Sequence, residues 1–389
     1  MAFREDFVWG AASSAYQTEG FPRADGSGDS IWDAFCRQPG AIANGEDGSV
    51  ACDGYHRFAE DIGLLASLGL SAYRFSTSWA RIDPNGDGRW NETGLQYYDR
   101  VVDCCLANGV TPWMTLYHWE LPHALEEKDS WQNSETAAAF SRFAGMMAAH
   151  FEGRVSHFIT LNEPQIVLKL GYADGIHAPG KRLSLPELVS CWKNLMLAHG
   201  LSFRAIRKAA PEALIGIAST GKLCYPHSPA DEDAARQETF RLTDSDWMFT
   251  HAIVLDAVCL GRDEPEAGAL RKLLSEVTPE EWDTMHAVPD FIGVNSYNGS
   301  EIARLYLLST TVVVVLCLVI SLPIEVYVMK FLFRAVMMES MTGWIEMWVS
   351  PTLYPRMLAA GLATYAVVAV LEYRRIIRVP MDEALKNVE

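Results

Sequence analysis

A carboxylic acid ends an apolar run near the middle of the chain. The run from His157 to Leu161 has the length of a buried strand, and it stops at Asn162, Glu163 and Pro164. Barrel enzymes keep their chemistry at the carboxyl ends of buried parallel strands, where polar groups meet a pocket. Asn162 and Glu163 could therefore carry an amide and a carboxylic acid into such a pocket. A plain polar loop after a structural strand is the alternative.

Other apolar runs carry polar or aromatic side chains inside them or directly behind them. These side chains belong to Gln17, Arg74, His118, Trp119 and Asn295. An arginine inside a buried run needs an acidic or polar partner, so Arg74 requires one. Taken singly, each has a structural alternative: His118 as a satisfied core histidine, Trp119 as packing and Gln17 as a loop cap. Their recurrence at strand ends favours a functional pocket.

These side chains can form one pocket only in a fold whose strands end close together. Six apolar runs of strand length alternate with helical patterns, and they lie at 7–11, 72–76, 111–117, 157–161, 214–218 and 290–297. Apolar residues at helical spacing between the runs predict helices that cover the sheet. The pattern predicts an α/β fold, an incomplete (β/α)8 TIM barrel, because a closed barrel of this type needs eight strands. Spacing alone leaves a doubly wound sheet as the alternative.

The overall composition excludes some classes of function. The formal net charge of −17 argues against a nucleic-acid partner, which would require a basic stripe. The eight cysteines show no C-x-x-C pair and no metal-ligand spacing, so we expect reduced thiols, no metal site and a cytosolic setting. The first residues lack the basic and apolar regions of a secretory signal, and nothing in them predicts export.

The character of the chain changes at Leu305. The twenty residues from Leu305 to Ile324 include no charge, and this is about the length that crosses a hydrocarbon core of roughly 30 Å. A second, shorter apolar segment runs from Met357 to Leu371. We therefore predict two transmembrane helices, at about 305–328 and 350–371, with membrane lipid as a partner. A buried core helix is the alternative for the first segment.

Basic residues predict how these helices would lie in a membrane. Arg374, Arg375 and Arg378 follow the second segment at once, and such flanks stay in the cytoplasm. With two spans, the N-terminal part faces the cytoplasm too. The predicted parts are a truncated barrel at 1–300, two helices with their connection at 301–372, and a basic cytoplasmic tail at 373–389. The predicted localisation is a membrane.

Five motifs occur in one order along the first part of the chain. They begin at Phe7 (Phe-Val-Trp-Gly-Ala-Ala-Ser-Ser-Ala-Tyr-Gln-Thr-Glu-Gly), Tyr73 (Tyr-Arg-Phe-Ser-Thr-Ser-Trp-Ala-Arg-Ile), Tyr117 (Tyr-His-Trp), Thr160 (Thr-Leu-Asn-Glu-Pro) and Phe291 (Phe-Ile-Gly-Val-Asn). Together they closely resemble glycoside hydrolase family 1, the β-glucosidase-like enzymes, over residues 1 to 300. The resemblance implies a hydrolase for β-glucosides that uses no cofactor and no metal.

The resemblance also implies roles for single residues. Glu163 matches the family's general acid/base. The glycone subsite corresponds to Gln17, His118, Trp119 and Asn162, and the surroundings of the nucleophile correspond to Arg74, Asn295 and Tyr297. These residue types suit a sugar, since amides and a neutral imidazole hydrogen-bond hydroxyl groups and a tryptophan offers an apolar face to the ring.

One catalytic part of the family pattern is missing. Retaining hydrolysis needs a protonated carboxyl and a second, ionised carboxylate about 5 to 5.5 Å away. The family's nucleophile is a glutamate in a Thr-Glu-Asn-Gly motif on the seventh strand, and no such motif follows Tyr297. Glu301, the nearest acid, lies in the wrong element. We therefore expect the chain to have an acid/base but no nucleophile and to be inactive; whether the family substrate is plain or 6-phosphorylated stays open.

The last stretch has a resemblance of its own. Residues 303 to 389 look like the C-terminal spans of FtsX-like permeases of the ABC transporter type, with arginines and a Pro-x-x-Glu-Ala-Leu-like tail. This implies ABC transporter subunits as partners if the tail functions. Two alternatives to a glycosidase follow: a non-enzymatic membrane protein that keeps a permease remnant, and an accidental fusion of two unrelated genes. The resemblance changes from one family to the other near residue 300, within the predicted barrel. This favours the accidental fusion, because natural fusions join complete domains.

Overall fold

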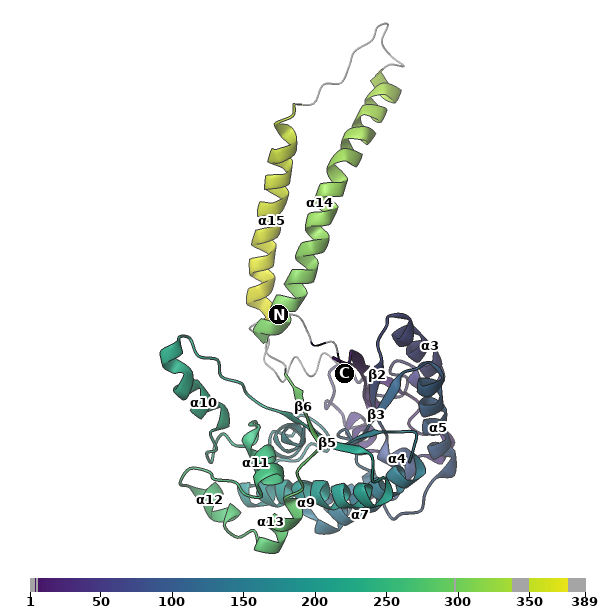
Figure 1. Cartoon of the computed structure of the whole chain (residues 1–389), viewed down its shortest axis with the longest axis vertical. Coiled ribbons are helices and arrows are strands. Elements are labelled where there is room, and N and C mark those ends of the chain that lie inside the picture. The colour runs from purple at the N-terminus through teal and green to yellow at the C-terminus, as the bar shows by residue number, and fades with distance from the viewer. Residues whose placement is uncertain (1–3, 5, 297–298, 338–349, 377–389) are drawn as a thin grey trace. The chain divides into compact units, whose positions relative to one another are not determined.

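The computed structural model describes residues 4, 6–296, 299–337 and 350–376. The chain divides into two compact units, Met1–Ser296 and Tyr297–Glu389 (Figure 1). Tyr297, which the family resemblance places beside the nucleophile, lies outside the described residues.

A sheet of six parallel strands forms the centre of the first unit. The strands are β1 (Gly10–Ala12), β2 (Ala72–Ser76), β3 (Thr111–Tyr117), β4 (His157–Asn162), β5 (Leu214–Thr220) and β6 (Phe291–Asn295). Each strand pairs with the one that precedes it in the sequence, in the order β1-β2-β3-β4-β5-β6. A doubly wound sheet would reverse its order at a switch point, so this order excludes it. The prediction of six strand units of a barrel is confirmed.

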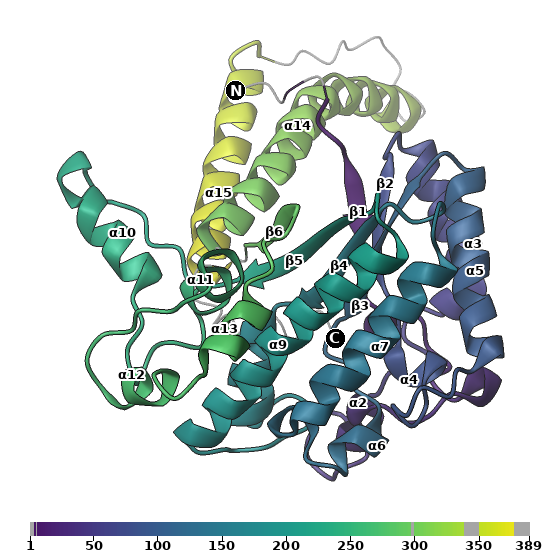
Figure 2. The ribbon, with the colours of Figure 1, turned by 60° about the horizontal axis from the view of Figure 1, so that its bottom comes forward.

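Helices of very different length connect the strands. They are α1 (Ala15–Thr18), α2 (Ile31–Cys36), α3 (Gly54–Ser67), α4 (Trp79–Ile82), α5 (Glu92–Ala107), α6 (His123–Glu126), α7 (Ser134–His150), α8 (Pro164–Ile166), α9 (Leu185–Ala209), α10 (Glu232–Phe240), α11 (Ala252–Leu260), α12 (Ala269–Leu274) and α13 (Pro279–Met285). The two long helices α7 and α9 lie side by side against the sheet (Figure 2).

The predicted helical faces form the core. On α7, Phe140, Phe143 and Met147 are fully buried, and on α9 so are Trp192 and Leu195. Apolar side chains at spacings of three and four residues gather on one side of a helix, which therefore packs against the sheet. The capping box predicted at the start of α9 is present.

The first strand is shorter than predicted. The expected run starts at Phe7, but pairing begins at Gly10, and the side chains of Phe7, Val8 and Trp9 are about half exposed. Within the described residues β1 pairs with β2 alone, so no second strand extends the ladder on its other side.

The second unit contains two long helices, α14 (Gly299–Met337) and α15 (Leu353–Ile376). They touch through the hydroxyls of Thr311 and Tyr365, which lie 2.7 Å apart. Within them, Thr310–Ala335 and Leu353–Arg374 are long and apolar enough to cross a membrane, judged by length and composition. The first helix extends beyond the predicted stretch at both ends, and it continues through Pro323 as predicted. Most of the predicted tail, residues 377–389, lies outside the described residues.

Candidate active site

Glu163 leaves the end of β4 with an unusual backbone. Its φ of 47° and ψ of 59° are left-handed, a conformation that costs free energy for any residue other than glycine. The turn is held by the Glu163 N–H, which donates to the carbonyl of Ala218 on β5 at 2.8 Å. Pro164 then opens α8, and the Glu163 side chain is fully buried. Trp119 behind β3 also has a positive φ, 71°. Such strain at two strand ends is typical of functional sites.

The side chain of Asn162 joins several strand ends. Its Oδ1 accepts hydrogen bonds from Nη2 of Arg74 on β2 at 2.5 Å and from Nδ2 of Asn295 on β6 at 3.1 Å. Its Nδ2 lies 3.2 Å from Nε2 of His118. Its backbone carbonyl accepts from the Trp119 indole N–H at 3.0 Å. Side chains from β2, β4, β6 and the end of β3 thus meet at one amide.

Glu163 belongs to the same cluster. Oε1 of Glu163 accepts a hydrogen bond from Nδ2 of Asn295. Arg74 is half-buried and has the polar partners that were expected for it, since its Nε donates to Thr115 at 2.9 Å and its Nη2 donates to Asn162. Of the residues selected from the sequence, the structure therefore gathers Arg74, His118, Trp119, Asn162, Glu163 and Asn295.

Gln17 is placed differently. It is half-buried on α1, where its side-chain oxygen accepts from Ser14 at 2.6 Å. Helix α1 is tied to the site region through Tyr16, whose N–H donates to the carboxyl of Glu120 at 3.2 Å. No recorded contact joins the Gln17 side chain to Asn162 or His118 within the part of the chain that the structure describes.

The hydrogen bonds assign the tautomer of His118. Burial, reinforced by the nearby positive charge of Arg74, lowers the pKa of His118 to about 3, so the ring is neutral near pH 7. Because an amide nitrogen can only donate, Nε2 accepts from Asn162 and the proton sits on Nδ1. Nδ1 is shielded from solvent, and within the described residues it has no hydrogen-bond partner. This N–H is a donor that a ligand could use.

The sequence analysis missed two contributors. Thr115 pairs in register with Ser76 of β2, and its hydroxyl accepts a hydrogen bond from Arg74. The alternation of side chains along β3 is the sequence signal that could have identified it. His177 lies in a loop, with its ring centroid 5.6 Å from that of Trp119, and no periodic signal marks it.

A buried network of charges supports the site from behind. The guanidinium of Arg81 lies 3.2 Å from the carboxylate of Glu19, and the hydroxyl of Tyr98 donates to the same carboxyl at 2.7 Å. Burial raises the pKa of Glu19, against the opposing effect of Arg81. Burial, with the charge of Glu19, also raises the pKa of Glu120 well above its usual value. Glu120 directly follows Trp119, so this network anchors the strand end that carries Trp119.

Comparison with known proteins gives one consistent result. The chain is 39% identical over 301 residues to β-glucosidase A of Thermotoga maritima, a match that covers 76% of this chain and 66% of that protein. It is 39% identical over 320 residues to β-glucosidase 25 of rice (Oryza sativa subsp. japonica), covering 76% of this chain and 61% of the relative. The chain thus spans at most about two thirds of the length of these relatives.

Solved structures give the same fold. A structure of the Thermotoga maritima β-glucosidase in complex with castanospermine superposes with a TM-score of 0.68 at 38% identity, over 75% of this chain and 65% of that one. The family model described as glycosyl hydrolase family 1 matches residues 1–310. With this match over most of its length, the chain belongs to glycosyl hydrolase family 1.

Proposed function

We propose that the unit Met1–Ser296 is the sugar-binding and proton-donating part of a retaining β-glycosidase that acts on β-glucosides. The observation that carries the proposal is the buried Nδ1–H of His118, which has no partner among the described residues and adjoins the Asn162 cluster. A buried donor without a partner costs free energy, and a hydroxyl group of a bound sugar would satisfy it.

The neighbouring residues suit the same ligand. Trp119 is buried, and its strained backbone turns the indole toward the cluster while its N–H binds the carbonyl of Asn162. An aromatic face beside neutral donors and acceptors is typical of sugar subsites. Gln17, held on α1 by Ser14, is proposed as a further polar contact to the glycone.

Glu163 is proposed as the general acid/base. It lies at the carboxyl end of β4, where barrel enzymes place catalytic groups, and Asn295 orients its carboxyl through a hydrogen bond. Retention requires a second carboxylate that attacks the anomeric carbon. No Thr-Glu-Asn-Gly motif follows Tyr297 in the sequence. We therefore propose that the chain by itself binds a β-glucoside weakly and does not hydrolyse it.

Two measurements on the purified full chain test this proposal. Calorimetric titration with castanospermine, the ligand of the Thermotoga structure, should give saturable binding. Aglycone release from an aryl β-glucoside should equal that of a Glu163→Gln control. Absence of castanospermine binding by a folded chain would contradict the sugar site. Clear release that Glu163→Gln abolishes would reveal a working nucleophile and contradict the predicted inactivity.

A non-enzymatic membrane protein is the second candidate. It is favoured by the lengths of the apolar helices, 26 residues in Thr310–Ala335 and 22 in Leu353–Arg374. On this proposal α14 and α15 contact lipid, both ends of the chain are cytoplasmic, and the FtsX-like segment associates with ABC transporter subunits. The membrane test is given in the Discussion.

A further inference from the structure

One edge of the β-sheet carries backbone groups that no other described strand pairs with. The carbonyl of Trp9 accepts from the Ser71 N–H and the N–H of Ser13 donates to the Arg74 carbonyl, both at 2.9 Å, so these groups face β2. Backbone groups of successive residues in a strand point to alternate sides. Gly10 and Ala12 therefore direct their N–H and C=O groups away from β2. Within the described residues β1 is the last strand on this side.

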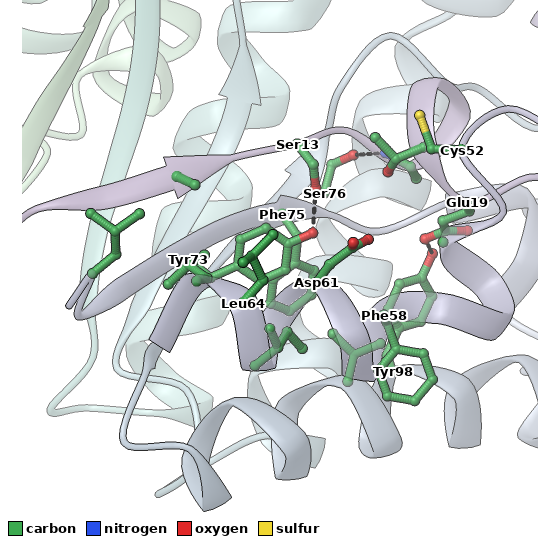
Figure 3. Close-up of a pocket in the computed structure, with 18 of the residues that line it drawn as sticks. Ser13, Glu19, Cys52, Phe58, Asp61, Leu64, Tyr73, Phe75, Ser76 and Tyr98 are labelled. Carbon is green, nitrogen blue, oxygen red and sulfur yellow. Dashed lines mark hydrogen bonds between the residues drawn. The ribbon is translucent and has the colours of Figure 1, made fainter. Parts of the chain in front are cut away.

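An apolar cavity lies behind this edge. It has a volume of about 400 Å³ and is bounded by β1, β2, α3 and α5. Figure 3 shows Tyr73 and Phe75 of β2 and Phe58 and Leu64 of α3 among the residues that line it. Leu64 is 60% exposed, and Leu68, at the end of α3, is 68% exposed. We call the edge of β1 with Leu64 and Leu68 the β1–α3 surface.

The opposite edge of the sheet, at β6, also exposes apolar side chains. On β5, Ile215 and Ile217 are fully buried, and α9 packs against this strand. On β6, Ile292 and Val294 are 44% and 57% exposed. β6 pairs with β5 alone within the described residues. Among the described residues, both edges of the sheet therefore present backbone groups without a strand partner and exposed apolar side chains.

We propose that the β1–α3 surface and the edge of β6 that points away from β5 together dock a second polypeptide made of two parallel strand-and-helix units, of the kind found in the part of the family 1 relatives that the match does not cover. A barrel of this type closes with eight strands, and the described part of the chain supplies six. One added strand pairs with β6, the other pairs with β1, and the helix after the latter covers the cavity beside Leu64 and Leu68. About a third of the length of these relatives lies outside the match.

A second copy of this chain fits the surface less well. Two copies joined through both edges would make a ring of twelve strands, wider than the eight-stranded barrel whose interior side chains can fill. The inference depends on the fold and not on sugar binding.

The test uses the full chain, kept in mild detergent, and the segment of Thermotoga maritima β-glucosidase A that has no counterpart in it. We expect a one-to-one complex in size-exclusion chromatography and protection of the Gly10 and Ala12 amides from hydrogen exchange. The double substitution Leu64→Lys/Leu68→Lys should weaken the complex at least ~tenfold in Kd, because burying a lysine charge replaces burial of a leucine. Leu106→Lys makes the same change on α5, at a leucine 45% exposed and outside the surface, and should leave Kd within about twofold.

A second variant tests the strand edge. Ala12→Pro removes an N–H that points away from β2, so it spares the existing ladder and should also weaken the complex. The proposal would be overturned if a chain shown to be folded formed no complex, or if the Leu64→Lys/Leu68→Lys variant bound as tightly as the parent. Self-association of the chain that this variant abolishes would also overturn it, because a second copy would then be the occupant. Castanospermine binding is measured separately. A complex without castanospermine binding would refute only the proposed function. Castanospermine binding without a complex would refute only this inference.

Discussion

The side-chain amide nitrogen of Asn162 lies 3.2 Å from Nε2 of His118, while the oxygen of the same amide accepts hydrogen bonds from Arg74 and Asn295. The two donors on the oxygen leave the nitrogen to face His118, and that nitrogen in turn fixes the protonated position of the imidazole. The Asn162 amide thereby connects residues of β2 and β6 to His118 at the end of β3. The donor offered by His118 depends on this arrangement.

His118→Phe should weaken castanospermine binding by about ten- to a hundredfold, because it removes one hydrogen bond at a buried site and keeps the ring volume. Isothermal titration calorimetry on the full chain measures the change. His157→Phe is the matched control, since His157 stacks on Trp113 at the other end of its strand. Equal losses for the two variants would remove His118 from the sugar site.

Arg81→Met should lower the free energy of unfolding by about 3 to 5 kcal/mol, because it leaves the carboxylate of Glu19 buried without its counter-charge. Urea denaturation followed by circular dichroism measures it. The double variant Arg81→Met/Glu19→Met should be more stable than Arg81→Met alone. Arg57→Met breaks an exposed pair with Glu60 and should cause no measurable loss. A double variant as unstable as the single one would contradict this account.

Stability should fall as the pH is lowered from about 6.5 to 4. His199 is fully buried between the Thr160 hydroxyl at 2.7 Å and the Ala287 carbonyl at 3.0 Å, and burial lowers its pKa to about 4. Within that pH range the unfolded chain binds the proton and the folded chain does not, so protonation favours unfolding. The effect is up to ~3 kcal/mol for this group.

His199→Gln isolates this contribution, because glutamine does not titrate. Denaturation curves at pH 7 and pH 4.5 should show a smaller difference for His199→Gln than for the parent chain. Other buried groups such as Glu120 titrate in both proteins and cancel in the comparison. An identical pH dependence of parent and variant would show that protonation of His199 does not lower the free energy of unfolding.

The full chain should remain in the membrane pellet after washing with alkaline carbonate, because α14 and α15 each carry an apolar stretch of spanning length. Immunoblotting of pellet and supernatant measures this. Truncation after Ser296 should release the protein into the supernatant. Extraction of the full chain by carbonate would refute the membrane proposal, and cleavage of the C-terminus by external protease would refute the cytoplasmic orientation.

The sequence by itself determined the strands and the family. The observed bounds of β2 and β3 equal the predicted runs at 72–76 and 111–117, because strand formation in a parallel sheet follows from a short, continuous apolar segment. The order of the motifs predicted the family that the comparison found. The residues proposed for the site at the strand ends were also selected this way, because a change from apolar to polar along the chain is a local signal.

Only the tertiary structure decided how those residues meet. Asn162 binds Arg74 across 88 positions of sequence and Asn295 across 133, and the left-handed turn at Glu163 depends on a carbonyl of β5. The shortened β1 and the uncovered Leu64 and Leu68 likewise reflect which neighbours are present. Hydrogen bonds between distant residues depend on strand register and on the curvature of the sheet, and no local pattern in the sequence encodes either of them.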